Sequence, residues 1–312
     1  MSNLDFFVIG AQKAGTTWLY NRFLEVEGFC LPRVKEVHYF DQVSHHSPYA
    51  DTSYFNNSLK VQVFKRPLRV LSKLKPIAFN LLQGNFWEAQ YHWLWNFRQP
   101  SDDWYASYMK HHKLKGLTGD LTPRHAILAE EDVLRMHKVA PKAKLIYCLR
   151  DPIEQTWSHW RMSVKVNKLD ISTAQNVEQL EAFIKPKPVL QHVKYLENSR
   201  KFEKVFQTKV EHFFYDDLKT DPKSYFKKIL SFIEPHKSWD LSRVNFNAQN
   251  LKGQELEMTP EILDLLKDKL HDLMLEMSQE GSGYFTQWYQ KYWSDTKEKS
   301  LSTGSSRKEA FK

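Results

Sequence analysis

The sequence predicts an α/β protein with a single domain, in which a doubly wound parallel sheet is flanked by helices. Three short apolar segments, residues 4–9, 144–149 and 210–215, carry this prediction. Each consists mainly of apolar residues, which is typical of a strand buried on both faces. Segments with helical spacing follow the strands, and this alternation favours a parallel sheet covered by helices on both sides.

The first strand breaks at Gly10, and a loop runs from there to Gly15. Thr16 and Thr17 then open a helix whose apolar positions are Trp18, Leu19, Phe23 and Val26 and which Gly28 closes. The order strand, loop, helix places the loop at the carboxyl end of a buried strand.

The second strand, residues 144–149, leads into Arg150-Asp151-Pro152. Asp151 can cap a helix and Pro152 fits its first turn, so we expect a helix to begin here. The third strand, residues 210–215, precedes helices expected at residues 222–233 and 260–277.

Residues of about 56–115 depart from this rhythm, and we expect a helical insertion over one end of the sheet, within one domain that spans residues 1–293. The insertion is rich in basic and aromatic residues: Lys60, Lys65, Arg66, Arg69, Lys73, Lys75, Trp87, Trp93, Trp95 and Trp104. Tryptophans at helical spacing are more often core than ligand platforms, so we expect most of them to be buried. Residues 294–312 are rich in Ser and Lys and are expected to form a disordered tail.

The composition favours an anionic ligand, because the 312 residues carry a formal charge of +8 and a pI near 9.2. Cys30 and Cys148 both stand in apolar surroundings, which argues against a disulfide framework and a cysteine zinc site. The chain starts without a basic region followed by a long apolar one, and no apolar run is long enough to span a bilayer. We therefore expect a soluble, cytoplasmic protein.

The loop after the first strand is a candidate phosphate cradle, since backbone N–H groups and a helix N-terminus converge there. Its two glycines are spaced as in an NTP-binding P-loop, so the fold is P-loop-like, but Thr16 stands where that motif requires Lys. The Lys lies inside the loop instead, which argues against an ordinary NTPase. The candidate cofactor-binding residues here are Gln12, Lys13, Ala14, Gly15, Thr16, Thr17 and Trp18.

This segment resembles the 5′-phosphosulfate loop of the sulfotransferases that use 3′-phosphoadenylyl sulfate (PAPS), in which a Lys in the position of Lys13 contacts the phosphosulfate. The second family motif places an Arg at the end of a strand and a Ser eight positions later, and both grip the 3′-phosphate. Arg150 and Ser158 have this spacing. A planar guanidinium suits charge-assisted binding of phosphate.

The segment Lys35-Glu36-Val37-His38-Tyr39-Phe40 is similar to one in carbohydrate sulfotransferases of the heparan-sulfate type and their bacterial relatives. The resemblance implies that Glu36 is the general base, with His38 as an alternative. Gly119-Asp120-Leu121-Thr122-Pro123 resembles a further segment near the acceptor. Asp120 either orients Lys13 or the acceptor, or it caps a helix that begins near Pro123.

Lys252-Gly253 falls where the family has a basic loop that closes over the nucleotide. The resemblance implies an enzyme that transfers a sulfuryl group from PAPS to a hydroxyl or amine, leaves PAP (3′-phosphoadenosine 5′-phosphate) as product and needs no metal. We expect the acceptor to be a carbohydrate or another hydroxylated small molecule, and we expect no nucleic-acid partner. The acceptor's identity and the oligomeric state stay open.

Two other functions remain as alternatives. One is a nucleotide or small-molecule kinase with a variant P-loop, which would depend on ATP and magnesium. The other is a binding protein without catalysis, whose basic insertion contacts nucleic acid or an anionic membrane.

Overall fold

The computed structural model describes residues 3–44, 46, 67–97, 100–185, 187–248, 256–281 and 283–294. The chain forms two compact units. The first unit contains Met1–Leu149 and Glu197–Lys252, and the second contains Arg150–Leu196 and Gly253–Lys312.

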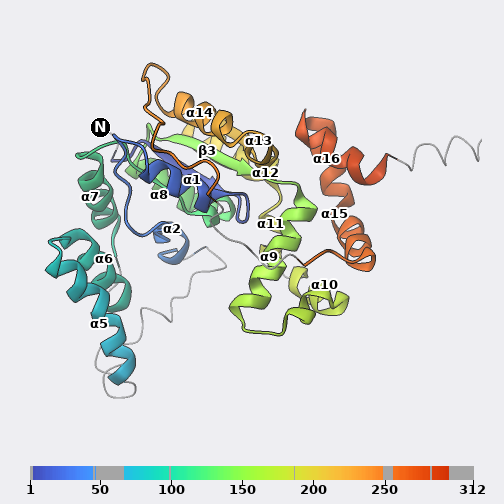
Figure 1. The fold of residues 1–312 in the computed structure, drawn as a ribbon, viewed down its shortest axis with the longest axis horizontal. Coiled ribbons are helices and arrows are strands. Elements are labelled where there is room, and N and C mark those ends of the chain that lie inside the picture. Colours follow the sequence, from blue (N-terminus) through green and yellow to red (C-terminus); the bar gives the residue numbers. More distant parts are fainter. Residues whose placement is uncertain are drawn as a thin grey trace, which may run out of the picture. The chain divides into compact units, whose positions relative to one another are not determined.

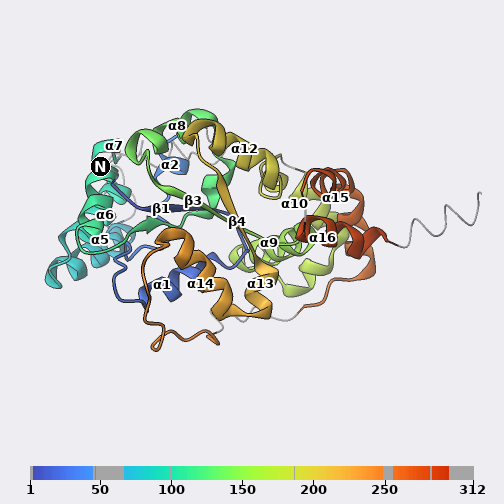
Figure 2. The same cartoon turned by 90° about the horizontal axis from the view of Figure 1, so that it is seen from above.

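The first unit contains a four-stranded parallel sheet in the order β2-β1-β3-β4 (Figure 2). Its strands are β1 (Phe6–Gly10), β2 (Gly119–Asp120), β3 (Lys144–Leu149) and β4 (Val210–Phe214). The three expected strands are all present: β1 is buried along its whole length and β3 nearly so, whereas β4 is buried only at Val210 and Phe213. The prediction of a parallel α/β sheet is therefore confirmed, with β2 as an additional short edge strand.

Helices cover both faces of this sheet. Figure 2 shows α1 and α14 on one side of the strands and α8 and α12 on the other, which is the doubly wound arrangement. The helices whose residues lie wholly or mainly in this unit are α1 (Thr16–Leu24), α2 (Tyr39–Gln42), α5 (Pro67–Leu82), α6 (Phe86–Phe97), α7 (Asp102–Lys113), the 3-10 helix η1 (Pro123–Ile127), α8 (Glu130–Val139), α12 (Tyr195–Phe206), α13 (Tyr215–Thr220) and α14 (Pro222–Ile233).

Aromatic side chains pack around β1, the strand next to the edge strand β2. Phe6 and Phe7 are fully buried, and Phe7 lies edge-on to Phe40 and Phe206. Strand β2 can approach β1 because Gly119 has no side chain: a Cβ there would lie 2.3 Å from Cε2 of Phe6. Only glycine fits this position. Because β2 can therefore pair with β1, the segment after β2 comes close to the end of β1.

The insertion is helical, as predicted, and comprises α5, α6 and α7 in its described part (Figure 1). Tyr91, Trp95 and Trp104 are buried, which confirms the core interpretation for them. Trp93 is exposed and Trp87 is half-buried, so the interpretation is wrong for the first and only partly right for the second. The predicted basic residues Lys60, Lys65 and Arg66 lie outside the described residues.

The second unit is helical in the residues that the structure describes (Figure 1). Asp151 caps α9 as predicted, because Asp151 Oδ1 accepts hydrogen bonds from the amides of Ile153 (2.9 Å) and Glu154 (3.3 Å). Helix α15 packs against α9, α10 and α16. The helices are α9 (Pro152–Val166), the 3-10 helix η2 (Ile171–Gln175), α10 (Val177–Ile184), α11 (Lys187–Gln191), α15 (Pro260–Glu280) and α16 (Tyr284–Trp293).

Two features of the sequence cannot be placed. Lys252 and Gly253, and the tail from residue 295 onward, lie outside the described residues. Among the helices that the structure describes, none is long and apolar enough to cross a membrane.

Candidate active site

The loop between β1 and α1 has the geometry of an anion cradle. Lys13 and Gly15 both adopt left-handed backbone conformations, with φ of 68° and 86°. The loop passes close to α13, since a Cβ on Gly15 would lie 2.8 Å from Cδ2 of Leu218. Helix α1 then begins at Thr16 with neither a side-chain cap nor an acidic residue in its first turn. Its first amides and its positive dipole end therefore favour an anion at this loop.

The loop residues differ in how accessible they are. Gln12, Lys13 and Thr17 are partly exposed, whereas Ala14 and Thr16 are buried. The ring of Trp18 packs edge-on against Tyr225 and Phe226 of α14, with ring centres 6.1 and 6.0 Å away. Trp18 thus anchors the first turn of α1 to the neighbouring helix through its side chain.

The segment after β2 lies beside the end of β1. A Cβ on Gly10 would lie 3.0 Å from Cβ of Ala126 and 3.1 Å from the carbonyl oxygen of Pro123, so η1 touches the last residue of the strand. Thr122 Oγ1 in turn accepts a hydrogen bond of 3.4 Å from the amide of His38. The start of the cradle, the segment after β2 and the segment around His38 therefore meet at one edge of the sheet.

Glu36 and His38 belong to a connected cluster of charged side chains. Nε2 of His38 lies 3.2 Å from Oε2 of Glu36, and its Nδ1 lies 2.9 Å from Oδ2 of Asp41. Arg124 approaches the same Asp41 oxygen at 3.3 Å, and Lys35 pairs with Glu36 Oε1. Asp41 is fully buried, whereas Glu36 and His38 are partly exposed, so the cluster has a buried end and an accessible end.

Mutual contact fixes the protonation states in this cluster. Burial by itself would raise the pKa of Glu36, but the hydrogen bond from His38 and the nearby Lys35 outweigh it and lower the pKa to about 2. Burial would likewise lower the pKa of His38, but hydrogen bonds to Asp41 and Glu36 raise it to about 9. At neutral pH, Glu36 is therefore a carboxylate and His38 an imidazolium.

Asp120 is fully buried and is linked to this cluster through Thr122. Its carboxylate accepts hydrogen bonds from the hydroxyls of Tyr105 (2.8 Å) and Thr122 (2.6 Å). It does not cap the following helix: the capping position of η1 is Thr122, with no side-chain cap bond. The cap interpretation is therefore wrong, because the carboxylate faces two hydroxyls and not the helix amides. The hydrogen bond between Asp120 and Thr122 positions Thr122 Oγ1, which accepts the hydrogen bond from the amide of His38.

In the second unit, Arg150 lies just before α9, and Ser158 lies about two turns into this helix. The guanidinium of Arg150 pairs with Glu154 at 3.2 Å, and Ser158 is buried. Arg161 lies one turn beyond Ser158, and the pKa of Arg161 is lowered, first by burial and then by the positive charge of Arg150. The positive charge of Arg150 therefore acts on Arg161.

A family model described as a sulfotransferase domain matches residues 3–297. The chain belongs to the sulfotransferase family. No curated protein matches it.

The fold of this sulfotransferase is shared with a solved structure. A sulfotransferase from Alicyclobacillus acidocaldarius is 14% identical and superposes with a TM-score of 0.55, covering 92% of this chain and 99% of that one. The sulfotransferase domain of an olefin synthase from Synechococcus PCC 7002 is 13% identical, with a TM-score of 0.43 and coverage of 86% and 94%. At such low identity, the first of these likenesses shows the shared fold alone.

Several residues that neighbour the candidate site residues were not predicted from the sequence. Asp41 follows His38 by three positions on a short helix, a spacing that could have revealed the pair. Arg161 follows Ser158 by the same spacing on α9. Arg124 is 83 positions from Asp41, and no local pattern connects them. Among the described residues, no group of three His, Cys, Asp or Glu side chains could hold a metal ion.

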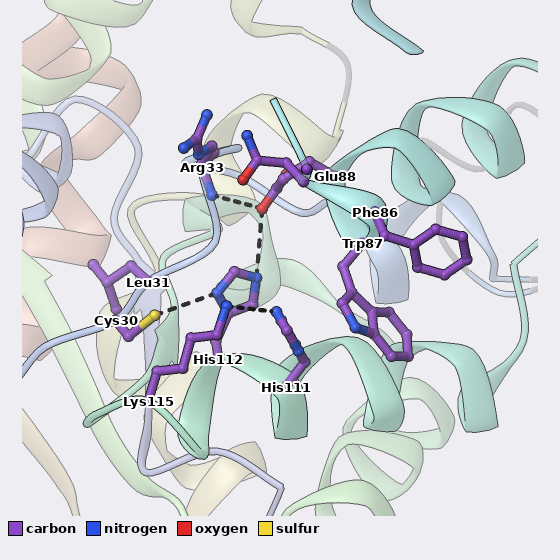
Figure 3. A pocket seen from close by; sticks show the side chains of 11 residues that line it. Cys30, Leu31, Arg33, Phe86, Trp87, Glu88, His111, His112 and Lys115 are labelled. Atoms are coloured by element: carbon purple, nitrogen blue, oxygen red, sulfur yellow. Dashed lines mark hydrogen bonds and ion pairs between the residues drawn. The ribbon is translucent and has the colours of Figure 1, made fainter. Parts of the chain in front are cut away.

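A cavity of about 370 Å³ lies elsewhere in the first unit (Figure 3). Its wall includes Cys30, whose amide bonds to the carbonyl of Leu117 just before β2, so this part of the cavity lies near the amino end of that strand. His112 lies between Cys30 Sγ (3.6 Å) and Glu88 Oε1 (3.4 Å). Burial raises the pKa of the Cys30 thiol, which keeps it protonated and argues against a nucleophilic role.

Proposed function

We propose that this sulfotransferase uses PAPS as donor and transfers its sulfuryl group to a hydroxyl or amine, with a carbohydrate as the acceptor. The observation that carries the donor assignment is the cradle between β1 and α1, in which Lys13 lies inside the loop and the helix N-terminus has no acidic or capping side chain. Such a loop suits the 5′-phosphosulfate of PAPS. The acceptor class follows from the resemblance of residues 35–40 to carbohydrate sulfotransferases.

The reaction we propose is an in-line displacement. The acceptor oxygen or nitrogen forms a bond to sulfur while the bond from sulfur to the bridging phosphate oxygen breaks, and PAP leaves with that electron pair. Lys13 and the loop amides stabilise the charge that develops on the departing oxygen. Positioning and charge stabilisation would supply most of the catalysis, as in phosphoryl transfer.

We assign the 3′-phosphate of the donor to Arg150 and Ser158 of the second unit. We propose Arg161, one turn beyond Ser158 on α9, as a second guanidinium for this site. Gln12, Ala14, Gly15, Thr16, Thr17 and Trp18 are proposed to contact the donor through the loop and the first turn of α1, and Lys252 and Gly253 through a loop that covers the nucleotide.

Glu36 is the proposed general base. It is ionised at neutral pH and can take the acceptor's proton, whereas His38 already carries one because its pKa is raised to about 9. We therefore assign His38 a positioning role: it holds Glu36 on one side and the buried Asp41 on the other. A carboxylate with a pKa near 2 is a weak base, which suffices if the proton leaves late in a loose transition state.

Replacing Lys13 by Ala tests the donor assignment. Sulfuryl transfer from radiolabelled PAPS to a panel of saccharides should fall by about 100-fold or more, in line with the loss of a group that stabilises a developing anion. Lys142→Ala, at an exposed position of the first unit, is the matched control and should keep full activity. Near-normal transfer by the Lys13→Ala protein would contradict the role of this residue.

A parallel assay separates the remaining alternatives. Phosphoryl transfer from ATP that requires magnesium, without transfer from PAPS, would favour the kinase.

The Glu36→Gln variant tests the general base: it should lose most of its turnover, by about 100-fold, while its affinity for PAP stays unchanged. Loss of PAP affinity in that variant would instead place Glu36 in the donor site.

A further inference from the structure

The turn between α5 and α6 exposes large apolar side chains. Leu82, the last residue of α5, is 86% exposed, and Phe86, the first residue of α6, is 60% exposed. Phe79 lies one turn before Leu82 and is also exposed. Side chains this accessible project from the surface, and clustered apolar residues of this kind mark an interaction site.

Cationic side chains surround the cavity beside this turn. Figure 3 shows Phe86 and Trp87 on one side of the cavity, with Arg33 and Lys115 on other sides of it. The acid among the residues that line it, Glu88, is buried and accepts hydrogen bonds from the amide of Arg33 and the hydroxyl of Tyr108. The charge that this surface presents to solvent is therefore positive.

The last turn of α7 continues the same pattern. Leu114, next to Lys115 in the chain, is 78% exposed, and Lys110 is exposed one turn earlier. We call the combined set the hairpin-turn surface; it consists of Phe79, Leu82, Phe86, Leu114, Arg33, Lys110 and Lys115.

We propose that the hairpin-turn surface docks the protein onto an anionic lipid bilayer as a peripheral contact. Projecting Leu and Phe side chains enter the soft boundary between headgroups and acyl chains, while Arg and Lys contact the lipid phosphates. This inference goes beyond the proposed sulfuryl transfer and does not depend on it.

The charges favour a lipid surface over a second copy of this chain. The protein carries a net charge of +8, and an interface between two such surfaces would bring two sets of Arg33, Lys110 and Lys115 close together. A projecting side chain such as Leu82 also needs a pocket on a rigid protein partner, whereas a bilayer accommodates it without one.

Co-sedimentation of the full chain with vesicles tests the proposal. Vesicles made of equal parts phosphatidylcholine and phosphatidylglycerol should bind the protein, and vesicles of phosphatidylcholine alone should bind it at least about tenfold more weakly, because surface lysines and arginines near anionic lipid each add attraction. Added salt should weaken binding to the anionic vesicles.

Two double variants separate the contributions. Leu82→Ser with Phe86→Ser removes apolar contact, and Lys110→Glu with Lys115→Glu reverses charge; each should reduce vesicle binding by about tenfold or more. Val166→Ser is the apolar control, because Val166 is 70% exposed in the second unit, and Lys142→Glu is the charge control. Both controls should bind like the unchanged protein.

Circular dichroism on each variant checks that the fold is retained, since all four altered positions are exposed. The proposal is overturned if the unchanged protein binds neither kind of vesicle, binds both equally, or loses binding no more in the double variants than in the controls. A dimer in sedimentation analysis that Leu82→Ser with Phe86→Ser dissociates, without vesicle binding, would assign the surface to a second copy instead.

Discussion

His38 is the side chain that touches both Glu36 and Asp41, so its replacement tests the charged cluster directly. His38 adopts a left-handed backbone conformation with φ of 56°. Asn tolerates this conformation better than most residues, which makes His38→Asn the substitution that least disturbs the backbone. The variant keeps a polar side chain but loses the positive charge.

The structure gives the sign and size of the effect. The folded protein raises the pKa of His38 from 6.5 to about 9, so protonation of His38 stabilises the fold fully below pH 6.5, and this stabilisation is lost as the pH rises through 9. The full shift corresponds to about 3 kcal/mol. Since 25% of the side chain is exposed, solvent screening reduces the expected contribution to roughly 1–2 kcal/mol.

Urea unfolding of both proteins across the range from pH 6 to pH 10 measures this contribution. The free energy of unfolding of the unchanged protein should exceed that of His38→Asn most at the acid end, and the difference should shrink as the pH rises through 9. Titrating groups that do not interact with His38 cancel in the difference. Glu36 and Asp41 do not cancel, because His38 lowers the pKa of both, and their response belongs to the measured effect. A difference that stays constant with pH would show that His38 is not held protonated by its two carboxylates.

Three further changes have clear expectations. Asp120→Asn should lower the free energy of unfolding by about 1–3 kcal/mol, because the carboxylate receives two hydroxyl hydrogen bonds in a buried site; an unchanged urea midpoint would contradict this. Gly15→Ala should cost about 1–2 kcal/mol from its left-handed backbone alone, and more from the clash with Leu218, so an unchanged melting temperature would refute the loop geometry. Tyr292→Phe removes a 2.7 Å hydrogen bond to the buried Asp151 and should lower the free energy of unfolding in urea by about 1 kcal/mol. An equal free energy of unfolding in the two proteins would contradict this bond.

Local patterns in the sequence predicted most of the first unit's sheet. Strands β1 and β3 consist mainly of apolar residues and are buried on both faces, as expected where helices cover a parallel sheet. Strand β4 is less apolar, since it contains Glu211 and His212 and is buried only at Val210 and Phe213. Strand β2 escaped prediction because it is two residues long, Gly119 and Asp120, and has no apolar pattern. It exists because the missing Cβ of Gly119 lets it pair beside Phe6, which is a long-range contact.

The same distinction applies to the candidate site. Lys13, Glu36, His38, Arg150 and Ser158 stand in local motifs and could be singled out from the sequence. Asp41 and Arg161 follow His38 and Ser158 by three positions, so helical spacing could have revealed them as well. Thr122 and Arg124 could not be found in this way, because they lie 84 positions from His38 and 83 from Asp41, the residues that they contact. Asp120 was ambiguous for this reason, since a carboxylate before Thr-Pro has the same local sequence whether it caps a helix or accepts bonds from distant hydroxyls.

The claim that the chain uses a PAPS-type donor is tested most directly by calorimetric titration with PAP, beside a matched titration with adenosine 5′-phosphate. The account predicts tight binding of PAP and a large loss without the 3′-phosphate, and it predicts that Ser158→Ala weakens binding of PAP but not of adenosine 5′-phosphate. Equal affinity for the two nucleotides would contradict the 3′-phosphate site. No binding of either by a folded sample would contradict the donor assignment itself.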